Sequence, residues 1–501
     1  MQKLIIGSRK SDLARIQAFS VGEKLMQAVP SLQVEYVFSS SFGDQNLDLD
    51  LSATPDKGIF TQDFVEHLRS GQLDLVVHSW KDLPVESRPG LKVVATLQRE
   101  DIRDVLLIKK SSWQDFDSNS SLKILSSSPR RVFNLSQGLV ALLPKPVDKI
   151  EFFPVRGNIA TRVSKLFASS HDGLVVAKAA LDRILSANQP EFLSAKKELR
   201  RFLDQCHFMV LPISINPTAA AQGGLAIEVN EQRSDLIDLL SKIDSPQDFQ
   251  IIEKEREILK SYGGGCHQKI GISCLTYEGH IVSFLKGLTD AGEILNSIQV
   301  MDVQHSSPEE SPRLCLENLA DCFERQQLDI NIDHILNRNL FVAKMDALPQ
   351  QVRPSNRVVV CSGIKTWKKL AALGHWVHAC SDGLGGRALP DLKVLLGEEP
   401  NFIKLSHKNS SDSDAEVDHN LSATYEMRPP KKWPDISCYT HFYWTSGYVF
   451  KQAVQRFPNL VEKKHACGLG KTFETLKQYL PQQSVEIFYS KQEWIQHYNG
   501  A

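Results

Sequence analysis

A lysine and an aspartate stand side by side at the end of a short apolar run. Lys81 and Asp82 follow residues 73–77, a segment rich in leucine and valine that passes into a polar cluster ending at Pro84. Such a run is typical of a buried strand whose end opens into a loop, and open α/β sheets bind ligands at that end. A carboxylate held in a cleft there can transfer protons. A solvated turn without chemistry is the alternative for an isolated Lys-Asp pair.

A cysteine in a glycine-rich segment is the second candidate for chemistry. Cys266 follows residues 263–265, all glycine, and precedes His267. Because glycine turns freely and adds no side chain, the thiol of Cys266 can serve as a nucleophile or a covalent attachment point. The nine cysteines form no C-x-x-C pair, so neither a disulfide framework nor a zinc site is predicted, and no metal is expected. Positions in the core are expected for Cys206, Cys274, Cys361 and Cys438.

Arginines and serines recur where expected strands pass into helices. The first turn of a helix leaves backbone amides free, and the arginine fork binds a carboxylate at two points, so this combination favours an acidic ligand. A surface position is the alternative for each residue taken alone. The residues at these junctions are Arg9, Ser11, Ser127, Ser128, Arg130, Arg131, Arg156, Arg162 and Arg183.

Two α/β lobes are expected to position these groups. Alternating strand and helix patterns cover residues 4–97 and again residues 122–211, and helices are expected to begin at Ser11 or Asp12, near Pro129 and at Asn158. Charged residues 99–104 and the segment near 207–212 suit hinges between the lobes, an arrangement that resembles periplasmic binding proteins. The polar residues 39–59 are expected to form a lid.

Composition places the chain among ordinary globular proteins. Its 501 residues predict three or four domains, and a net charge of −1 provides no overall field for nucleic acid or anionic lipid. No segment reaches the roughly 18 to 20 apolar residues of a membrane span, and the apolar run at the start is too short for a secretory signal. We therefore expect a cytoplasmic protein, without nucleic-acid or membrane partners. The oligomeric state stays open, with a monomer as one alternative.

Taken together, the segments from about residue 4 to 345 resemble the porphobilinogen deaminase (hydroxymethylbilane synthase) family of tetrapyrrole and heme biosynthesis. The resemblance rests on the order of residues 8–14, 57–60, 78–84, 99–101, 127–131, 156–162, 222–223 and 264–266. It implies a transferase that joins four porphobilinogen molecules with loss of ammonia. It also implies a dipyrromethane cofactor, bound covalently through Cys266.

The resemblance assigns roles to individual residues. Asp82 would be the catalytic residue, protonating the departing amine and then, as a carboxylate, steadying positively charged pyrrole intermediates. Cofactor binding would fall to Cys266, Lys81, Ser127, Ser128, Arg130, Arg131 and Arg183. Arg9, Ser11, Arg156 and Arg162 would bind porphobilinogen and the growing polypyrrole. Phe42, where many relatives have arginine, and Asp12, where most have proline, depart from the family pattern.

The resemblance also predicts the domain organisation. Residues 1–98 with 212–243 would form the first domain, 99–211 the second, and 244–347 a small α+β third domain that carries the cofactor cysteine. Residues 354–501 would form a separate C-terminal α/β domain. The rival interpretation of the first part is a non-catalytic two-lobed binder of carboxylated small molecules, which explains the arginines but not Cys266 or Asp82.

The C-terminal region contains a second glycine-rich motif, Gly468 to Thr472. It is not a nucleotide-binding Walker loop, because His465 stands where that loop needs glycine. With the preceding Thr445-Ser446, the order of motifs resembles the later part of uroporphyrinogen-III synthase, with the opening part of that family absent. Two alternatives stay open: a reduced but working synthase, or a remnant that serves assembly or stability.

Overall fold

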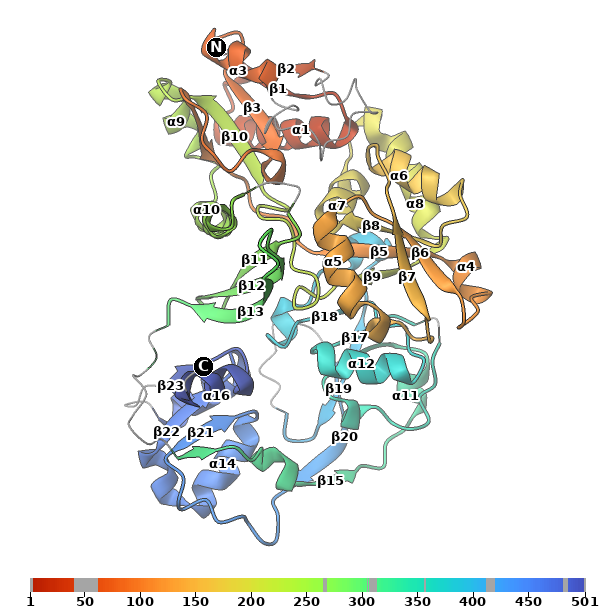
Figure 1. Ribbon diagram of the computed structural model, residues 1–501, viewed down its shortest axis with the longest axis vertical. Coiled ribbons are helices and arrows are strands. Elements are labelled where there is room, and N and C mark those ends of the chain that lie inside the picture. Colours follow the sequence, from red (N-terminus) through yellow and green to blue (C-terminus); the bar gives the residue numbers. More distant parts are fainter. Residues whose placement is uncertain are drawn as a thin grey trace.

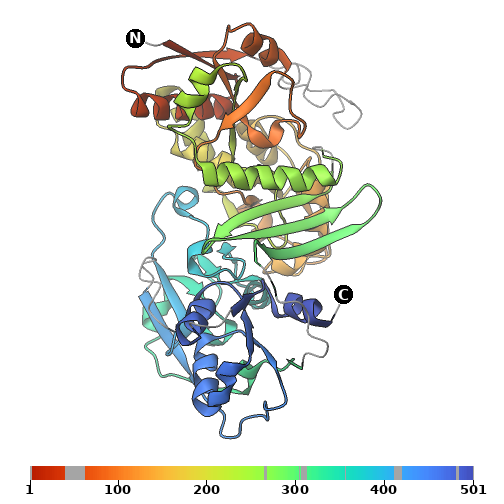
Figure 2. The same cartoon turned by 90° about the vertical axis from the view of Figure 1, so that its left-hand side faces the viewer.

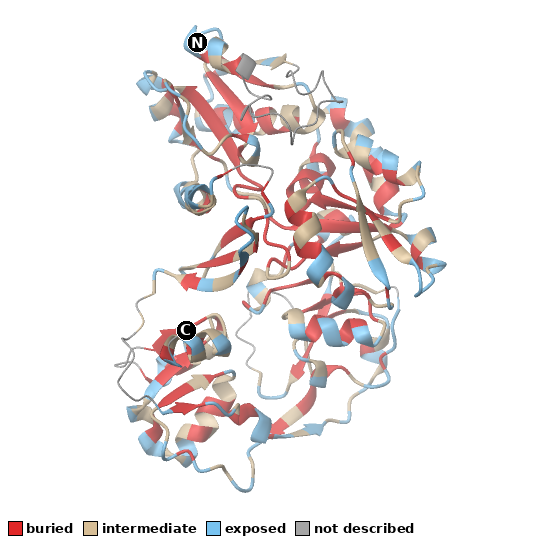
Figure 3. Ribbon diagram, viewed as in Figure 1, coloured by how far each residue is buried: buried red, intermediate tan, exposed pale blue. Residues whose placement is uncertain are grey.

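The computed structural model describes residues 3–39, 62–264, 268–303, 305, 313–355, 357–410, 420–480 and 485–499. Within these ranges the chain forms five sheets. Three sheets come from residues up to 301 and lie in the upper part of Figure 1, and two come from residue 314 onward and lie in the lower part. The central strands are buried, whereas exposed residues lie mainly on helices and turns (Figure 3). The predicted α/β class is confirmed.

The first lobe is built on a mixed sheet in the order β2-β1-β3-β10-β4. β1 runs parallel to β2 and β3, but β10 is antiparallel to β3 and β4. β10 runs in the opposite direction because the chain enters this strand on its return from the second lobe. The elements are β1 (Lys3–Arg9), α1 (Asp12–Ala28), β2 (Gln33–Ser39), α3 (Gln62–Arg69), β3 (Leu75–Ser79), β4 (Leu91–Ala95), β10 (Leu225–Asn230) and α9 (Ser234–Leu240).

The second lobe repeats this plan in the order β7-β6-β8-β5-β9. β6 pairs in parallel with β7 and β8, and β5 lies antiparallel between β8 and β9. Its elements are β5 (Asp104–Lys109), α4 (Lys110–Gln114), β6 (Ser121–Leu125), α5 (Pro129–Gly138), β7 (Lys149–Phe153), α6 (Ile159–Phe167), β8 (Gly173–Ala177), α7 (Lys178–Ser186), α8 (Leu193–Leu203) and β9 (Cys206–Val210).

Two segments connect these lobes. The first crossover, residues 96–103, leads from β4 to β5, and the second crossover, residues 211–224, leads from β9 back to β10. Three helix starts agree with the sequence: Ser11, Ser128 and Asn158 cap α1, α5 and α6 through their side chains, and Pro129 is the first residue of α5. The residues predicted to form a lid lie almost entirely outside the described residues, Phe42 included.

A small third unit combines one helix with an antiparallel sheet. The helix is α10 (Pro246–Ser261), and the strands are β11 (Gly271–Tyr277), β12 (His280–Leu288) and β13 (Ile294–Met301). Figure 2 shows α10 lying alongside this sheet, between the first lobe and the C-terminal half. The carboxylate of Glu255, fully buried in α10, binds Arg99 of the first crossover and the backbone N–H of Ala221 in the second.

The C-terminal half contains two α/β sheets. One has six strands in the order β15-β20-β19-β16-β17-β18, and the other has four in the order β14-β21-β22-β23. The strands are β14 (Leu314–Cys315), β15 (Glu324–Gln327), β16 (Asn339–Val342), β17 (Val359–Cys361), β18 (Ala379–Cys380), β19 (Phe402–His407), β20 (Asn420–Arg428), β21 (His441–Trp444), β22 (Lys464–Cys467) and β23 (Val485–Ile487). The helices are α11 (Asp333–Leu336), α12 (Ile364–Ala372), α13 (Lys393–Leu396), α14 (Gly447–Arg456), α15 (Lys471–Tyr479) and α16 (Lys491–Asn499).

Strand pairing differs from the expectation that residues 244–347 belong together. β14 pairs with β21, β15 with β20, and β16 with β17 and β19, so residues 314–342 complete the C-terminal sheets. The chain passes from the four-stranded sheet to the six-stranded sheet after β14 and returns after β20. Residues 314–342 therefore supply strands to both sheets of the C-terminal half. Strands of two to four residues were missed because they are too short to show periodicity.

The C-terminal half packs on the second lobe through a buried apolar interface. One continuous core cluster includes Leu106 and Met209 of the second lobe together with Trp367 and Val342 of the C-terminal half. Trp367 donates its indole N–H to the carbonyl of Leu142 (3.1 Å), and the backbone N–H of Val210 in β9 donates to the carbonyl of His378 (2.7 Å). The two halves are thus joined by packing and by backbone pairing.

Three of the four cysteines expected in the core are buried, but Cys438 is exposed because it lies in a turn. None of the helices in the described part of the chain is long and apolar enough to cross a membrane.

Candidate active site

Asp82 lies in a short turn that is anchored from behind. The turn η1 (Trp80–Asp82) follows β3 directly, and its buried Trp80 packs edge-on against Phe249 of α10 with ring centres 4.9 Å apart. Arg256 of the same helix donates to the carbonyls of Leu83 (3.3 Å) and Pro84. In the 3₁₀ turn, Asp82 is exposed and Lys81 half-buried.

Lys81 connects this turn to the second crossover. Its Nζ donates to Oε1 of Gln222 (3.2 Å), whose amide group in turn donates to Oδ1 of Asp104 (2.8 Å). Burial lowers the pKa of Lys81, the carboxylate of Asp82 opposes this shift, and the guanidinium of Arg131 adds to it. A side chain of the first lobe is therefore linked through Gln222 to the second.

Asp104, at the start of β5, is the centre of a buried charge cluster that sequence reasoning did not identify. Its fully buried carboxylate accepts hydrogen bonds from Arg130 (3.0 Å) and from Arg131 (2.9 and 2.7 Å). Burial alone would raise the pKa of Asp104, but Arg131 and then Arg130 hold it well below its usual range. Asn216 also donates to this carboxylate (2.9 Å). In this structure both guanidiniums thus bind an internal carboxylate, and their contact with cofactor stays a prediction.

Asp82 faces positive charge from the second lobe. Arg162, in α6, donates from Nε to the carbonyl of Gly157 (2.7 Å). Burial lowers the pKa of Arg162, the positive charge of Arg131 lowers it further, and the carboxylate of Asp82 opposes both. Asp82 and Arg131 are therefore near enough to Arg162 to act on it electrostatically, although they come from different lobes. The charges of Asp82, in the first lobe, and of Arg131 and Arg162, in the second, therefore interact.

Several of the other predicted residues make hydrogen bonds within the protein. Ser11 and Ser128 use their hydroxyls as helix caps (3.4 Å each), and Ser127 exchanges two 2.7 Å hydrogen bonds with the backbone of Val155. Arg183 donates to the carbonyl of Gly223 (2.7 Å) in the second crossover. Arg9 and Arg156 are half-buried near the ends of β1 and β7. Ligand contacts of all these residues stay predictions.

The predicted attachment residue, Cys266, lies outside the described residues together with His267. Its described neighbour Gly264 has φ +61°, and a Cβ there would lie 3.2 Å from Cγ2 of Val85. Val85 is three residues beyond Asp82. The chain leading to Cys266 therefore passes close to the turn that carries Asp82.

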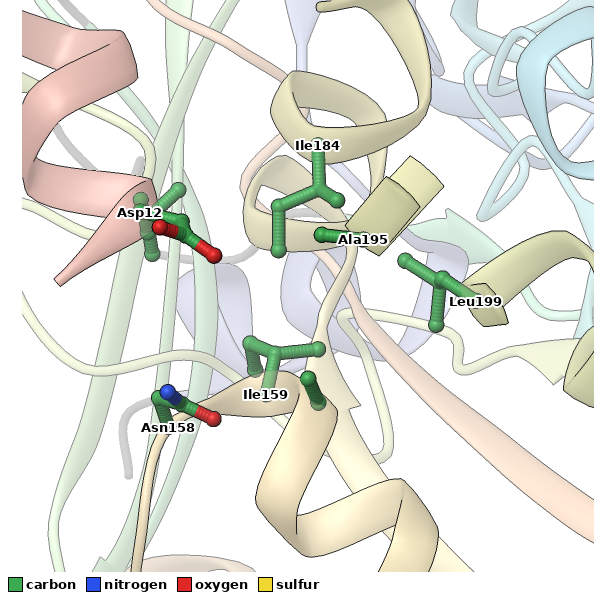
Figure 4. Close-up of a pocket in the computed structure, with 8 residues that line it drawn as sticks. Asp12, Asn158, Ile159, Ile184, Ala195 and Leu199 are labelled. Carbon is green, nitrogen blue, oxygen red and sulfur yellow. The ribbon is translucent and has the colours of Figure 1, made fainter. Parts of the chain in front are cut away.

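The two lobes touch beside this site. Arg15 of α1 pairs with Glu191 (3.1 Å), and Gln189 donates to Glu23 (2.8 Å). Asp12, the family departure noted above, begins α1 and lines a small cavity of about 20 Å³ between the lobes (Figure 4). A cavity of this size holds at most one water molecule. Its remaining lining comes from α1, α6, α7, α8 and the cap of α6, at Leu13, Asn158, Ile159, Ala160, Ile184, Ala195 and Leu199.

Comparison with known proteins decides the family. Residues 4–238 match the family model described as porphobilinogen deaminase, dipyromethane cofactor binding domain. A porphobilinogen deaminase of Syntrophomonas wolfei is 36% identical over 267 residues, which are 53% of this chain and 78% of the relative. One from Caldicellulosiruptor saccharolyticus is 33% identical over 299 residues, 60% of this chain and 93% of the relative.

The chain belongs to the porphobilinogen deaminase family. The predicted cofactor class is confirmed, because the matched model is the cofactor-binding domain of that family. The match to the family model ends at residue 238, so it does not include the C-terminal half.

Likeness to solved structures is weak. A putative periplasmic sulfonate-binding protein of Methylobacillus flagellatus has a TM-score of 0.26 at 13% identity, covering 52% of this chain and 69% of the other. The reduced OxyR regulatory domain of Pseudomonas aeruginosa has a TM-score of 0.25 at 13% identity, covering 48% of this chain and 97% of the other. With such scores neither adds to the family assignment.

Proposed function

We propose that the chain is a working porphobilinogen deaminase, which condenses four porphobilinogen molecules into hydroxymethylbilane and releases ammonia. The observation that carries this is the anchored turn that holds Asp82 exposed, beside Lys81 of its own lobe and opposite Arg131 and Arg162 of the other. A carboxylate set among cations suits proton transfer to a leaving amine and stabilisation of the cation that remains.

The donors around the cleft suit a ligand that carries several carboxylates. Ammonium, guanidinium and hydroxyl groups come from both lobes, in the sets that the sequence assigned to cofactor and substrate. When bound, the dipyrromethane supplies the pyrrole carbon to which each new unit is added. Cys266 would hold it through sulfur, close to the turn of Asp82, because Gly264 already lies against Val85.

Asp82→Asn tests the assignment. We expect turnover to fall by about 10² to 10⁴, because the amide cannot donate the proton. The covalent cofactor should remain, as measured by the mass of the denatured protein. Asp115→Asn, which changes an exposed carboxylate at the end of α4, is the matched control and should keep normal turnover. Normal turnover by the Asp82 variant would reject the role.

The rival, a non-catalytic binder of carboxylated molecules, makes the opposite prediction for the same variant. A carboxylate beside an anionic ligand repels it, so removing the charge of Asp82 should tighten binding and no ammonia should be released by either form. Ammonia release by the wild-type chain excludes this alternative.

For the C-terminal half we propose a complete uroporphyrinogen-III synthase unit rather than a remnant. Residues 314–499 contain two α/β sheets joined by two connections, which supports a two-lobed unit with a cleft. The motifs at Ser446 and Gly470 both lie where a strand of the four-stranded sheet passes into a helix, as the cap residues of α14 and α15. We accordingly infer that the third deaminase domain is confined to residues 244–303.

Isomer analysis of the ring formed from the product tests this second activity. The full chain should give the type III uroporphyrinogen, whereas spontaneous closure gives type I. A Lys471→Ala variant should shift the product toward type I without slowing ammonia release. If the full chain gives only type I, the synthase proposal fails and a role in assembly or stability is left.

A further inference from the structure

One loop of the C-terminal half reaches both crossovers between the deaminase lobes. We call residues 381–389 the clamp loop. Its Asp382 is buried, with φ +50°, and its carboxylate accepts hydrogen bonds from the backbone N–H of Ile213 (3.1 Å) and of Ser214 (3.1 Å). The hydroxyl of Ser214 donates to the same carboxylate at 2.6 Å. The second crossover is thereby held at three points by one side chain.

The clamp loop also holds the first crossover. The guanidinium of Arg103 donates to the carbonyl of Ala388 (2.8 Å). Leu384 of the loop shares a buried apolar cluster with Ile102 of the first crossover and Ile213 of the second. A single loop therefore contacts the two segments about which the lobes would rotate.

These contacts lie next to the charge cluster at the active site. Arg103 is followed directly by Asp104. In the second crossover, Asn216 and Pro217 accept hydrogen bonds from Arg130 (3.2 and 2.7 Å) shortly after the residues held by Asp382. A shift of either crossover would therefore displace the groups that bind Arg130 and Arg131.

Asp382 of the clamp loop also connects to the four-stranded sheet of the C-terminal half. The hydroxyl of Tyr489, just beyond β23, donates to the backbone carbonyl of Asp382 (2.7 Å). The clamp loop thus joins both C-terminal sheets to both crossovers between the deaminase lobes. Such shared contacts can couple binding in one half to the conformation of the other.

We propose that the clamp loop sets the relative orientation of the two deaminase lobes, with Asp382 as a positioning residue for the condensation reaction. The inference rests on the proposed deaminase function. It goes further in giving the C-terminal half a part in the activity of the N-terminal half.

Asp382→Ala in the full chain, assayed well below its unfolding temperature, tests the proposal. We expect kcat for ammonia release to fall about five- to tenfold, a typical size for coupling through packed elements, with the covalent cofactor still present. A purely structural role would lower the unfolding temperature and leave kcat and KM unchanged. Asp391→Asn, an exposed carboxylate just beyond the loop, should leave kcat unchanged.

Two further measurements keep the test decisive. Ser214→Ala removes one of the three contacts and should lower kcat about twofold, and adding it to Asp382→Ala should cause no further loss, since the contact is already gone. Additive losses, or unchanged kcat and KM in both single variants, would overturn the proposal. If Asp382→Ala does not fold, the kcat of Ser214→Ala decides between the outcomes: a loss of about twofold supports the proposal and an unchanged value overturns it.

Small-angle scattering separates failure of the inference from failure of the proposed function. Loss of the clamp should increase the radius of gyration of the folded Asp382→Ala variant relative to wild type, whether or not the chain turns over porphobilinogen. An unchanged radius would count against the clamp. Absence of turnover in the wild-type chain would count against the deaminase proposal alone.

Discussion

At the scale of single residues, the candidate active site contains two carboxylates in opposite surroundings. Asp82 is exposed in the turn after β3, whereas Asp104 is fully buried and binds Arg130 and Arg131. The first can exchange protons with a ligand, and the second fixes two guanidiniums and cannot readily be protonated. Positive charge at the site is therefore positioned by an internal anion before any substrate binds.

Asp104→Asn should lower the free energy of unfolding by about 3 kcal/mol, because two buried guanidiniums lose their counter-charge. Since the pKa of Asp104 is held below its usual range, this stabilisation is complete above about pH 4 and is lost as the pH falls further. Urea unfolding at pH 7 measures the difference. Lys149→Ala, which breaks an exposed pair with Glu151, should change stability by no more than about 0.5 kcal/mol. A similar small effect for Asp104→Asn would contradict this account.

Local signals predicted several of these residues, and long-range contacts account for those missed. The caps Ser11, Ser128 and Asn158 each act within three residues of their own position, so their types and spacing were sufficient. The importance of Asp104 depends on Arg130, Asn216 and Gln222, which are 26 to 118 residues away along the chain. No periodicity in the sequence reports such partners.

At the scale of elements, β22 contains a histidine that is kept neutral. His465 is buried, accepts the indole N–H of Trp444 at Nδ1 (3.0 Å), and has Nε2 2.9 Å from the carbonyl of Leu460. With one nitrogen accepting and the other donating, the ring has no place for a second proton. Burial accordingly lowers the pKa of His465 to about 4.

Acid should therefore destabilise the C-terminal unit. The pKa of His465 is depressed in the folded state, so its contribution is complete above about pH 6.5 and is lost as the pH falls toward 4. Between pH 7 and pH 5 the loss from this group is about 2 kcal/mol. In His465→Gln the unfolding free energy should fall less over that interval, whereas His334→Gln, at an exposed position, should behave like wild type. Equal slopes in all three proteins would refute the claim.

At the scale of the whole molecule, the N-terminal and C-terminal halves share one buried apolar core. Trp376 lies at this junction, with its ring centre 5.3 Å from that of Trp113 and its indole N–H donating to the carbonyl of Phe208 (2.8 Å). The sequence predicted a separate C-terminal domain, but the packing of that domain could not be read from it. The residues of this interface are apolar, and in the sequence they cannot be distinguished from residues of the core within each half.

Trp376→Ala should lower the free energy of unfolding by about 3 to 5 kcal/mol, as expected for deleting a buried tryptophan. Because the interface is shared, the second lobe and the C-terminal half should both become easier to unfold, as shown by hydrogen exchange in β9 and β18. Leu373→Ala, 57% exposed in the same half, is the control and should change little. Exchange that rises in only one half would contradict a shared core.

The central claim is that this family member builds its product on a pyrrole pair attached through the sulfur of Cys266, with Asp82 as the proton-transferring group. The intact mass of the denatured, reduced chain tests it most directly. We predict an added mass equal to two linked pyrrole units, lost in Cys266→Ser and retained in Asp82→Asn. A wild-type mass equal to that of the bare polypeptide, or an adduct that survives replacement of Cys266, would contradict the account.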